Sequence, residues 1–247
     1  MKFLHDPNLP ETDVSMAVVS GTYPAFNDAL HRLGVDTILV SYDPKNANQL
    51  TDHADLQIFD FGDGAVYLSS GLPKIKKKLE KLGFHVTELP YMVSGPYPHD
   101  VKLNAVLLRK WLIVNPKTAA PEFLNCFSQT KRIISVKQGY TKCSTAVVDN
   151  HSIITSDQGI AAAASKGGID VLQIRPGYIR LKGYDYGFIG GACGKIGADR
   201  IAFCGRIEDH PDFPRIKTFL SAREIIPVTL ADCPLTDVGG IVPLISR

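Results

Sequence analysis

Runs of apolar residues recur along the chain at an almost constant distance. The runs that precede amphipathic segments centre on Val18, Val66, Ile113, Ile153 and Ile201, which are 48, 47, 40 and 48 residues apart. A period of this length is typical of solenoids, propellers and other repeat architectures, in which each repeat is one supersecondary unit. The pattern therefore predicts five copies of one structural unit.

Each complete copy is expected to contain two strands, a helix and a third strand. Apolar residues at helical spacing predict one helix in every copy, namely Ala25–Leu33, Leu72–Leu82, Pro121–Ser128, Gly159–Ser165 and Phe213–Ala222. Apolar runs after the helices predict the third strands Val35–Val40, Phe84–Leu89, Arg132–Val136, Ile169–Ile174 and Glu224–Leu230. The opening strands of the second to fifth copies are expected at His53–Phe59, Val101–Leu108, Ser144–Asp149 and Gly187–Ala192.

The first copy has no clear opening strand. An apolar segment, Ile241–Leu244, follows the fifth copy instead. We expect this segment to pair with Met16–Ser20 and to close the five units into a ring, because closure removes an unpaired sheet edge. Residues 1–247 would then form a single α/β domain, a five-bladed ββαβ propeller. The alternative is a terminal strand added to an ordinary α/β sheet.

Composition narrows the classes of partner. The chain is 45% hydrophobic and 21% charged, as in an ordinary soluble domain. Its net charge of +2 gives no general attraction for phosphate, so no nucleic-acid partner is expected. The sequence contains no apolar run of membrane-spanning length and no signal peptide, so no membrane contact is expected. The five cysteines are odd in number and never spaced C-x-x-C, which argues against disulfides and structural zinc and favours the cytoplasm.

The repeat pattern over the whole chain resembles that of the pentein superfamily. The segments Gly139–Ser144, Ile154–Ile160 and Gly187–Gly191 look more specifically like an uncharacterised bacterial branch of it. The superfamily comprises five-bladed ββαβ propellers that modify guanidino groups, among them arginine deiminases, dimethylargininases, agmatine deiminases and amidinotransferases. It also includes a non-catalytic ribosomal anti-association factor. The resemblance thus implies the fold, and it leaves the activity open.

One departure from the pentein pattern concerns the nucleophile. Catalytic penteins commonly end in Gly-Gly-x-x-Cys, whose cysteine attacks the guanidinium carbon. Here Gly239-Gly240-Ile241-Val242 is followed by Pro243, which has no nucleophilic atom. The family's partner histidine often occurs as His-x-Asp, and the nearest match, His99-Asp100, has a different spacing. The resemblance therefore implies that the usual covalent mechanism is absent.

The segment His99–Asn104 is the first candidate for chemistry. In a strand, Asp100, Lys102 and Asn104 would share one face and could line a central channel. The Asp100 carboxylate could bind a guanidinium or an ammonium group, and His99 could act as an acid or base near neutral pH. The alternative is a solvated entry to a strand.

Lys142-Cys143 opens the fourth copy at an equivalent point. A neighbouring ammonium group lowers the pKa of a thiol, which makes Cys143 the best remaining candidate for a nucleophile. The alternative is a small buried apolar residue, as free cysteines usually are. Asp237, just before the Gly239-Gly240 pair, is a candidate for an acid that faces the axis.

The glycine-rich segment Gly187–Gly197 fits neither a Walker loop nor a dinucleotide-binding motif, so no cofactor is expected. We interpret Gly190-Gly191 as a strand whose backbone comes close to the axis, where a ligand could touch it, and Gly194–Gly197 as a hairpin turn. The histidines are scattered without metal-ligand spacing, so no metal site is expected.

Three functions remain open. The first is binding of a small cationic or amino-acid-like ligand by Asp100, Asn104 and Asp237 without covalent chemistry. The second is a guanidino- or amidine-modifying enzyme that uses Cys143 as nucleophile and His99 as acid or base. Whatever the function, Lys102, Lys142, Gly190 and Gly191 are further candidates for the ligand site. The third is a non-catalytic macromolecular interaction protein. The sequence does not indicate the oligomeric state.

Overall fold

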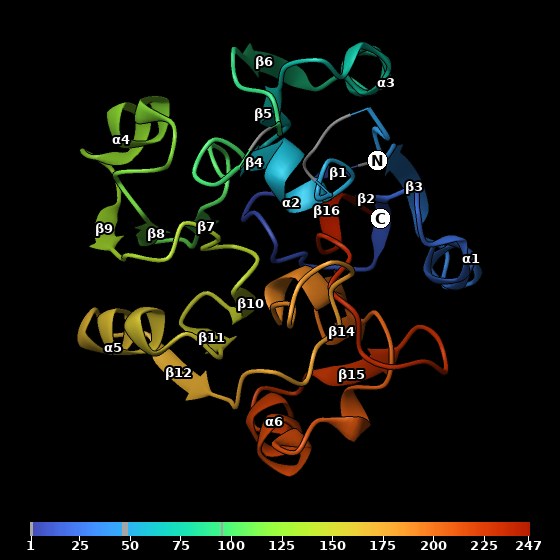
Figure 1. Cartoon of the computed structure of the whole chain (residues 1–247), viewed down its shortest axis with the longest axis vertical. Coiled ribbons are helices and arrows are strands. Elements are labelled where there is room, and N and C mark those ends of the chain that lie inside the picture. The colour runs from blue at the N-terminus through green and yellow to red at the C-terminus, as the bar shows by residue number, and fades with distance from the viewer. Residues whose placement is uncertain (1, 46–48, 95) are drawn as a thin grey trace.

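In the computed structural model of the chain, small β-sheets are arranged about a common centre (Figure 1). The structure describes residues 2–45, 49–94 and 96–247. In these residues the strands are β1 (Lys2–Phe3), β2 (Val14–Ser20), β3 (Asp36–Val40), β4 (Ile58–Gly62), β5 (Ala65–Ser69), β6 (His85–Leu89), β7 (Val106–Leu107), β8 (Trp111–Val114), β9 (Arg132–Ser135), β10 (Thr145–Asp149), β11 (Ser152–Thr155), β12 (Asp170–Gln173), β13 (Cys193–Gly197), β14 (Arg200–Phe203), β15 (Ile226–Thr229) and β16 (Val242–Ser246). The helices are α1 (Pro24–Arg32), α2 (Ala54–Gln57), α3 (Pro73–Lys81), α4 (Pro121–Phe127), α5 (Gln158–Lys166) and α6 (Phe213–Ser221), with short 3₁₀ turns η1 (Gly190–Ala192) and η2 (Ile207–Asp209).

The described strands form five sheets with one repeated topology. Four sheets have the orders β4-β5-β6, β7-β8-β9, β10-β11-β12 and β13-β14-β15, and the remaining one has the order β1-β16-β2-β3. In each, the first two strands of the motif pair antiparallel, and the third pairs parallel with the second after a helical crossover. The predicted order of strand, strand, helix and strand is therefore confirmed for the last four copies.

The crossover helices α1, α3, α4, α5 and α6 match the predicted ranges to within one or two residues at each end. Proline stands at the first or second position of α1, α3, α4 and α6. It fits there because the first N–H groups of a helix have no intrahelical partner. In α5 the Asp157 carboxylate takes this role and accepts a hydrogen bond from the Ile160 N–H at 2.7 Å.

The C-terminal strand β16 completes the first sheet. It pairs antiparallel with β2, with Val242 opposite Val18 and Pro243 opposite Ala17. Pro243 stands in a strand flanked on both sides and has no N–H to donate. The register shifts directly after Pro243, an irregularity of the kind that lets a sheet accept proline. The predicted pairing of the C-terminal segment with Met16–Ser20 is confirmed.

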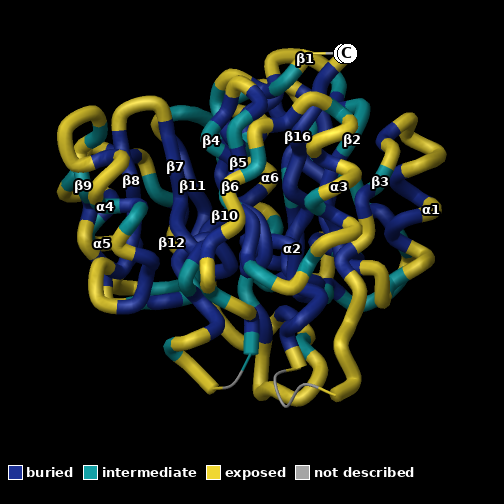
Figure 2. The backbone as a smooth tube through the Cα atoms, turned by 90° about the horizontal axis from the view of Figure 1, so that it is seen from above, coloured by how far each residue is buried: buried dark blue, intermediate teal, exposed yellow. Residues whose placement is uncertain are grey.

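Apolar clusters fill the space between neighbouring sheets. Phe123 belongs to the cluster shared by the second and third sheets, and Phe203 to that shared by the fourth and fifth. A further cluster joins residues of the fifth sheet, such as Ile196, to residues of the first, such as Ala17. Figure 2 shows the buried backbone gathered in the middle of the molecule, with exposed backbone in the peripheral loops and on the outer sides of the helices.

The segments at the axis differ most from the predictions. The expected strand His53–Phe59 is instead the short helix α2 followed by β4, and the expected strand Val101–Leu108 is reduced to β7. No strand forms over the expected range Gly187–Ala192, where Gly190-Gly191 lies in the 3₁₀ turn η1, and the expected hairpin turn Gly194–Gly197 lies within β13.

These differences share a physical cause. Residues in the axial segments are buried on all sides, so apolar and polar positions do not alternate and the period that identifies a strand is lost. All four residues of α2 are buried, including Asp55. A Cβ atom on Gly190 would lie 2.2 Å from the Lys142 carbonyl oxygen, so the turn at η1 is fixed by contact between backbones.

No helix in the described part of the chain combines the length and the apolar character needed to cross a lipid bilayer.

Candidate functional site

A cavity of about 230 Å³ lies where the segments that link successive sheets converge. It is lined by Leu50, His53, Tyr140, Cys143, Leu181, Tyr184, Asp185, Tyr186, Phe188 and Asp237. These residues come from four of the links, and the remaining link contributes Asn104, whose side-chain amide donates to the Cys143 sulfur at 3.2 Å. We call this space the central cavity. Its walls therefore depend on all five repeats.

Asp237 is held in the wall of the central cavity by backbone groups. Its Oδ2 accepts a hydrogen bond from the Phe188 N–H at 2.9 Å, and its Oδ1 accepts one from the Gly239 N–H at 3.0 Å. The Nδ1 atom of His53 lies 3.8 Å from Oδ1. Only 1% of Asp237 is exposed, and this burial, together with the nearby carboxylate of Asp55, raises the pKa of Asp237 despite the opposing effect of His53.

Glycines make room for Asp237 and His53. A Cβ atom on Gly191 would lie 2.0 Å from Asp237 Oδ1, and one on Gly187 would lie 2.5 Å from Asp237 Cβ. Gly239 has φ +80°, and a Cβ there would lie 2.3 Å from the Cα atom of His53. Side chains at these positions would displace the acid or the imidazole, so the backbone itself forms part of the wall.

Cys143 lines the same cavity, where its surroundings favour the neutral thiol. The residue is 2% exposed, and burial, followed by the charges of Asp55 and Asp237, raises the pKa of the thiol well above its ordinary value. Lys142 acts in the opposite direction, as the sequence suggested, but its effect is smaller. The expected activation of the thiol by Lys142 is therefore outweighed.

Asn104 fixes the turn that carries Cys143. Its Oδ1 accepts hydrogen bonds from the N–H groups of Lys142 at 2.7 Å and Cys143 at 3.3 Å, and its Nδ2 also donates to the Asp55 carbonyl oxygen at 2.8 Å. Asn104 thus links three of the axial segments. Its side chain makes these contacts with the protein itself, so its role is to position the residues of the cavity.

The Lys142 side chain points away from the central cavity. Its Nζ lies 3.5 Å from the Gly190 carbonyl oxygen, and it lines a separate void of about 20 Å³ together with Asp55 and Asp60. That volume corresponds to roughly one water molecule. The Gly190-Gly191 backbone contacts the axial segments closely, since the Gly191 N–H donates to the Cys143 carbonyl oxygen at 2.9 Å.

The segment His99–Asn104 forms turns, so the predicted common face of Asp100, Lys102 and Asn104 does not exist. His99 is exposed and does not line the central cavity. Asp100 lies behind the wall, where its Oδ2 accepts a hydrogen bond from the Tyr140 hydroxyl at 2.7 Å. Lys102 donates to the Thr118 carbonyl oxygen at 3.1 Å, on the side of the third sheet.

Aromatic rings and carboxylates give the central cavity its chemical character. The ring centroids of Tyr140 and Phe188 lie 6.0 Å apart, and those of Tyr186 and Phe188 lie 6.2 Å apart. The charged groups in the lining are Asp237 and Asp185, next to the titratable imidazole of His53. Among the described residues that line it there is no lysine or arginine. Aromatic faces and carboxylates both attract cations, so the lining favours a positively charged ligand.

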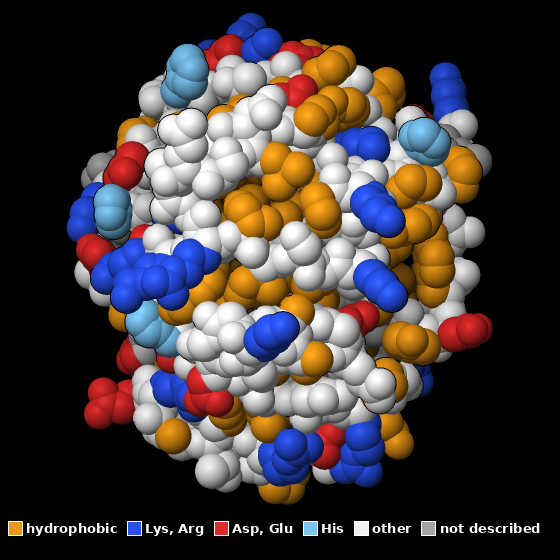
Figure 3. Space-filling view, turned by 90° about the vertical axis from the view of Figure 1, so that its left-hand side faces the viewer, with side chains coloured by type: hydrophobic (Ala, Val, Ile, Leu, Met, Phe, Trp, Pro, Cys, Tyr) orange, Lys and Arg blue, Asp and Glu red, His pale blue; other side chains and the backbone are white. Residues whose placement is uncertain are grey.

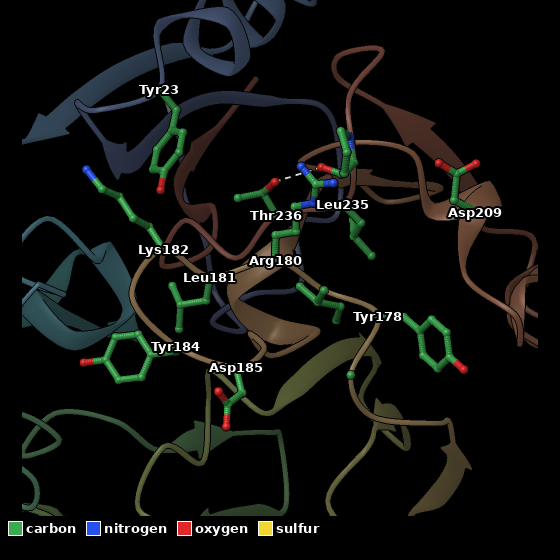
Figure 4. Close-up of a pocket in the computed structure, with 13 residues that line it drawn as sticks. Tyr23, Tyr178, Arg180, Leu181, Lys182, Tyr184, Asp185, Asp209, Leu235 and Thr236 are labelled. Carbon is green, nitrogen blue, oxygen red and sulfur yellow. Dashed lines mark hydrogen bonds between the residues drawn. The ribbon is translucent and has the colours of Figure 1, made fainter.

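The loop between β12 and η1 lines both the central cavity and an outer pocket of about 550 Å³, which is shown in Figure 4. Tyr184 and Asp185 line both spaces. A third space of about 160 Å³, which we call the side cavity, adjoins the central one, since His53 and Leu181 line both. Loops of this length without regular structure commonly cover functional sites.

The sequence did not single out His53, Asp52 or Asp55. His53 and Asp55 lie at the start of α2, in the stretch interpreted as a strand, and Asp52 directly precedes it. The signal that could have found them is three titratable residues within four positions, directly before the apolar residues Leu56, Ile58 and Phe59. In the described part of the chain, no group of three or more His, Cys, Asp or Glu side chains is arranged to hold a metal ion.

The surface over α4 and α5 shows basic side chains interspersed with acidic, polar and apolar ones (Figure 3).

The sequence from residue 18 to residue 242 matches one protein family, described as "Family of unknown function (DUF6873)". The chain belongs to this family. No curated protein matches the chain.

Several solved structures share the fold. The inosamine-phosphate amidinotransferase of Streptomyces griseus is 9% identical with a TM-score of 0.61, and the match covers 100% of this chain and 97% of that one. The agmatine deiminase of C. jejuni is 8% identical with a TM-score of 0.59, covering 92% and 90%. A mutant dimethylarginine dimethylaminohydrolase of Pseudomonas aeruginosa, complexed with citrulline, is 8% identical with a TM-score of 0.51, covering 88% and 93%. The DUF6873 chain therefore has the pentein fold, as its sequence predicted.

Proposed function

We propose that this DUF6873 protein binds a small organic cation, such as an ammonium or guanidinium compound, in the central cavity. The observation that carries the proposal is the charge of the lining, in which two carboxylates and several aromatic rings meet no lysine or arginine among the described residues. The two lysines that could have reversed this charge, Lys102 and Lys142, make their contacts elsewhere.

The state of Asp237 supports a ligand of positive charge. Burial disfavours its ionised form, and a cation placed beside it would favour that form again. The wall already supplies two N–H donors to the carboxylate, so Asp237 is held in place before a ligand arrives. A preorganised acid costs less to order on binding than a mobile one.

Binding can be tested with simple probes of opposite charge. Pentylamine and pentylguanidine should stabilise the protein against thermal unfolding, whereas pentanoate should not. Asp237→Asn should weaken pentylamine binding by about tenfold or more, while Asp28→Asn, on the exposed face of α1, should leave it unchanged. Stabilisation by pentanoate alone would reject the proposal, as would an Asp237→Asn protein that binds the amine with unchanged affinity.

Asp100 gives a second, graded test. Because its carboxylate touches the hydroxyl of Tyr140 behind the wall, Asp100→Asn should weaken binding less than Asp237→Asn does. Equal losses would place the ligand in a different part of the axis.

A second candidate is guanidino or amidine chemistry at Cys143, with the imidazole of His53 nearer than that of His99. The observation in its favour is that the thiol lines the same cavity as Asp237. In such a reaction the thiolate would attack the guanidinium carbon, an amine would leave with a proton, and water would release the product and the thiol. The raised pKa of Cys143 argues against this in the free protein. Turnover of a guanidino compound that Cys143→Ser abolishes while binding persists would establish it.

We also propose that residues 1–247 form one domain whose ring is closed by the pairing of β16 with β2. The support is the apolar cluster that joins the fifth and first sheets in the same way as the other neighbours are joined.

A further inference from the structure

We propose that the ligand carries two cationic ends and that the Asp52 carboxylate, in the side cavity, receives the second one. This inference rests on the proposed function, because it takes the first cationic end to be held at Asp237. The ligand class is then an α,ω-diamine or a related compound with an amine or guanidine at each end and an apolar spacer.

The side cavity shares a buried acid and aromatic rings with the central one. It is lined by Thr22, Tyr23, Tyr42, Gln49, Asp52, His53, Leu181 and Lys182. Asp52 is 4% exposed, and its Oδ2 accepts a hydrogen bond from the Ser20 hydroxyl at 2.5 Å. The Ser20 oxygen in turn accepts one from the Thr22 N–H at 3.1 Å, which fixes the hydroxyl and with it the acid. Tyr23 and Tyr42 supply aromatic surface beside this carboxylate.

The two cavities adjoin at one pair of residues. His53 and Leu181 line both, so a ligand that spans Asp237 and Asp52 would have to pass between these two side chains. Asp52 and His53 are consecutive and precede α2, where the His53 N–H donates to the Leu50 carbonyl oxygen at 3.0 Å. The turn holds the carboxylate in one cavity and the imidazole at the boundary of the other. The Leu181 side chain matches the apolar spacer of the ligand.

Lys182 would favour a carboxylate over a cation in the side cavity. It also lines the side cavity and could pair with the carboxylate of a zwitterionic amino acid. Figure 4 shows its side chain beside Tyr23, and the residue is exposed. An exposed ammonium group is screened by water and salt, whereas a buried carboxylate acts at short range in a lower dielectric. The geometry therefore favours a cation at the side cavity.

The test compares three series of probes with equal chain lengths by isothermal titration calorimetry at neutral pH. The series are α,ω-diaminoalkanes from propane to hexane, the corresponding monoamines, and the corresponding ω-amino acids. In the wild-type protein the best diamine should bind about tenfold or more tightly than its monoamine, and more tightly than its amino acid. Asp52→Asn should lower the affinity for the diamine to that of the monoamine and leave the affinity for the monoamine unchanged. Lys182→Gln should bind the diamine with unchanged or higher affinity.

Equal binding of diamine and monoamine in the wild-type protein would overturn the inference and leave the proposed function standing. An amino acid that binds most tightly and is weakened by Lys182→Gln would also overturn it. Failure of all three series to bind would overturn the proposed function with it. If Asp52→Asn does not fold, the wild-type series and Lys182→Gln, which alters only an exposed side chain, still decide the question.

Discussion

The outer strand–helix–strand part of each repeat and the links that meet at the axis are packed by different rules. In the outer part, apolar side chains such as Phe123 and Leu79 fill the space between neighbouring sheets. At the axis, Asp55, Asp237 and Lys142 are buried in a framework of glycines and turns. The comparison suggests that the outer part supplies the stability, while the axis keeps buried charged groups that burial alone would penalise.

Asp60 is a buried acid near the axis that lowers the stability of the fold when it is ionised. It is fully buried, one of its carboxylate oxygens accepts a hydrogen bond from the Gly62 N–H at 2.9 Å, and the other has no partner among the described residues. Burial raises the pKa of Asp60 to about 7. A group of this kind destabilises the fold when ionised, so its presence is not explained by stability.

The largest effect is expected from removal of the segment that joins the two regions. Deletion of Val238–Arg247 removes β16, which pairs with β2, and should abolish the cooperative thermal unfolding transition. Circular dichroism during heating measures this. An unchanged midpoint would show that the pairing does not close the ring.

In the outer part, a single core truncation should affect stability alone. Phe123 is fully buried, and its ring centroid lies 4.4 Å from that of Phe59. Phe123→Ala should lower the free energy of unfolding by about 3–5 kcal/mol, measured by denaturant titration, with unchanged affinity for amines. Ile226→Ala, at an exposed position of β15, should change it by less than about 0.5 kcal/mol. An affinity that falls with Phe123→Ala in protein that remains folded would contradict the division into two regions.

At the axis, a single added methyl group should affect binding more than stability. The Cβ of Gly191→Ala would meet the Asp237 carboxylate at 2.0 Å, so the acid must move. We expect a loss of stability of about 1–3 kcal/mol and a fall in amine affinity of tenfold or more. Gly159→Ala, in α5 and outside the cavity lining, should leave the affinity unchanged. Unchanged binding in the Gly191 variant would mean that Asp237 does not hold the ligand.

A smaller effect is expected from Asp60, on the pH dependence of the free energy of unfolding. Since its folded-state pKa is about 7 and its ordinary value is 3.8, the folded state holds a proton that the unfolded state loses between these values. Its contribution to stability is therefore present at low pH and declines as pH rises, by at most about 1.4 kcal/mol per pH unit. Asp60→Asn should remove this part of the decline between about pH 4 and pH 7, as measured by denaturant titrations, and Asp28→Asn should not. Parallel profiles of stability against pH for the wild-type protein and Asp60→Asn would contradict the raised pKa of Asp60.

The sequence predicted the outer part of the fold well because its helices and strands each bury one face. The helices α3 and α6 and the strands β9 and β12 begin and end within a residue of the predicted positions, since their apolar periodicity is clear. It predicted the axial segments poorly, because in α2 and η1 apolar, polar and glycine residues are buried together.

The candidate site divides in the same way. Asp237 and Cys143 were singled out from neighbouring motifs, and both line the central cavity. His99 was chosen for its neighbour Asp100, but the turns of that segment leave it exposed. His53 and Asp52 were missed because their role depends on links from different repeats meeting in space, which spacing along the chain does not reveal.

The central claim, that Asp237 receives a cation, is tested most directly by the pH dependence of pentylamine binding to the wild-type protein. Burial raises the pKa of Asp237, and His53, Asp55 and Asp185 are the other titratable groups beside it or in the lining. Affinity should be weak where Asp237 is protonated, rise with pH as it ionises and then level off, with proton release on binding in the rising part. Calorimetry from about pH 4 to about pH 8 in two buffers of different ionisation enthalpy measures both quantities. Affinity that is independent of pH, with no proton release, would contradict the account.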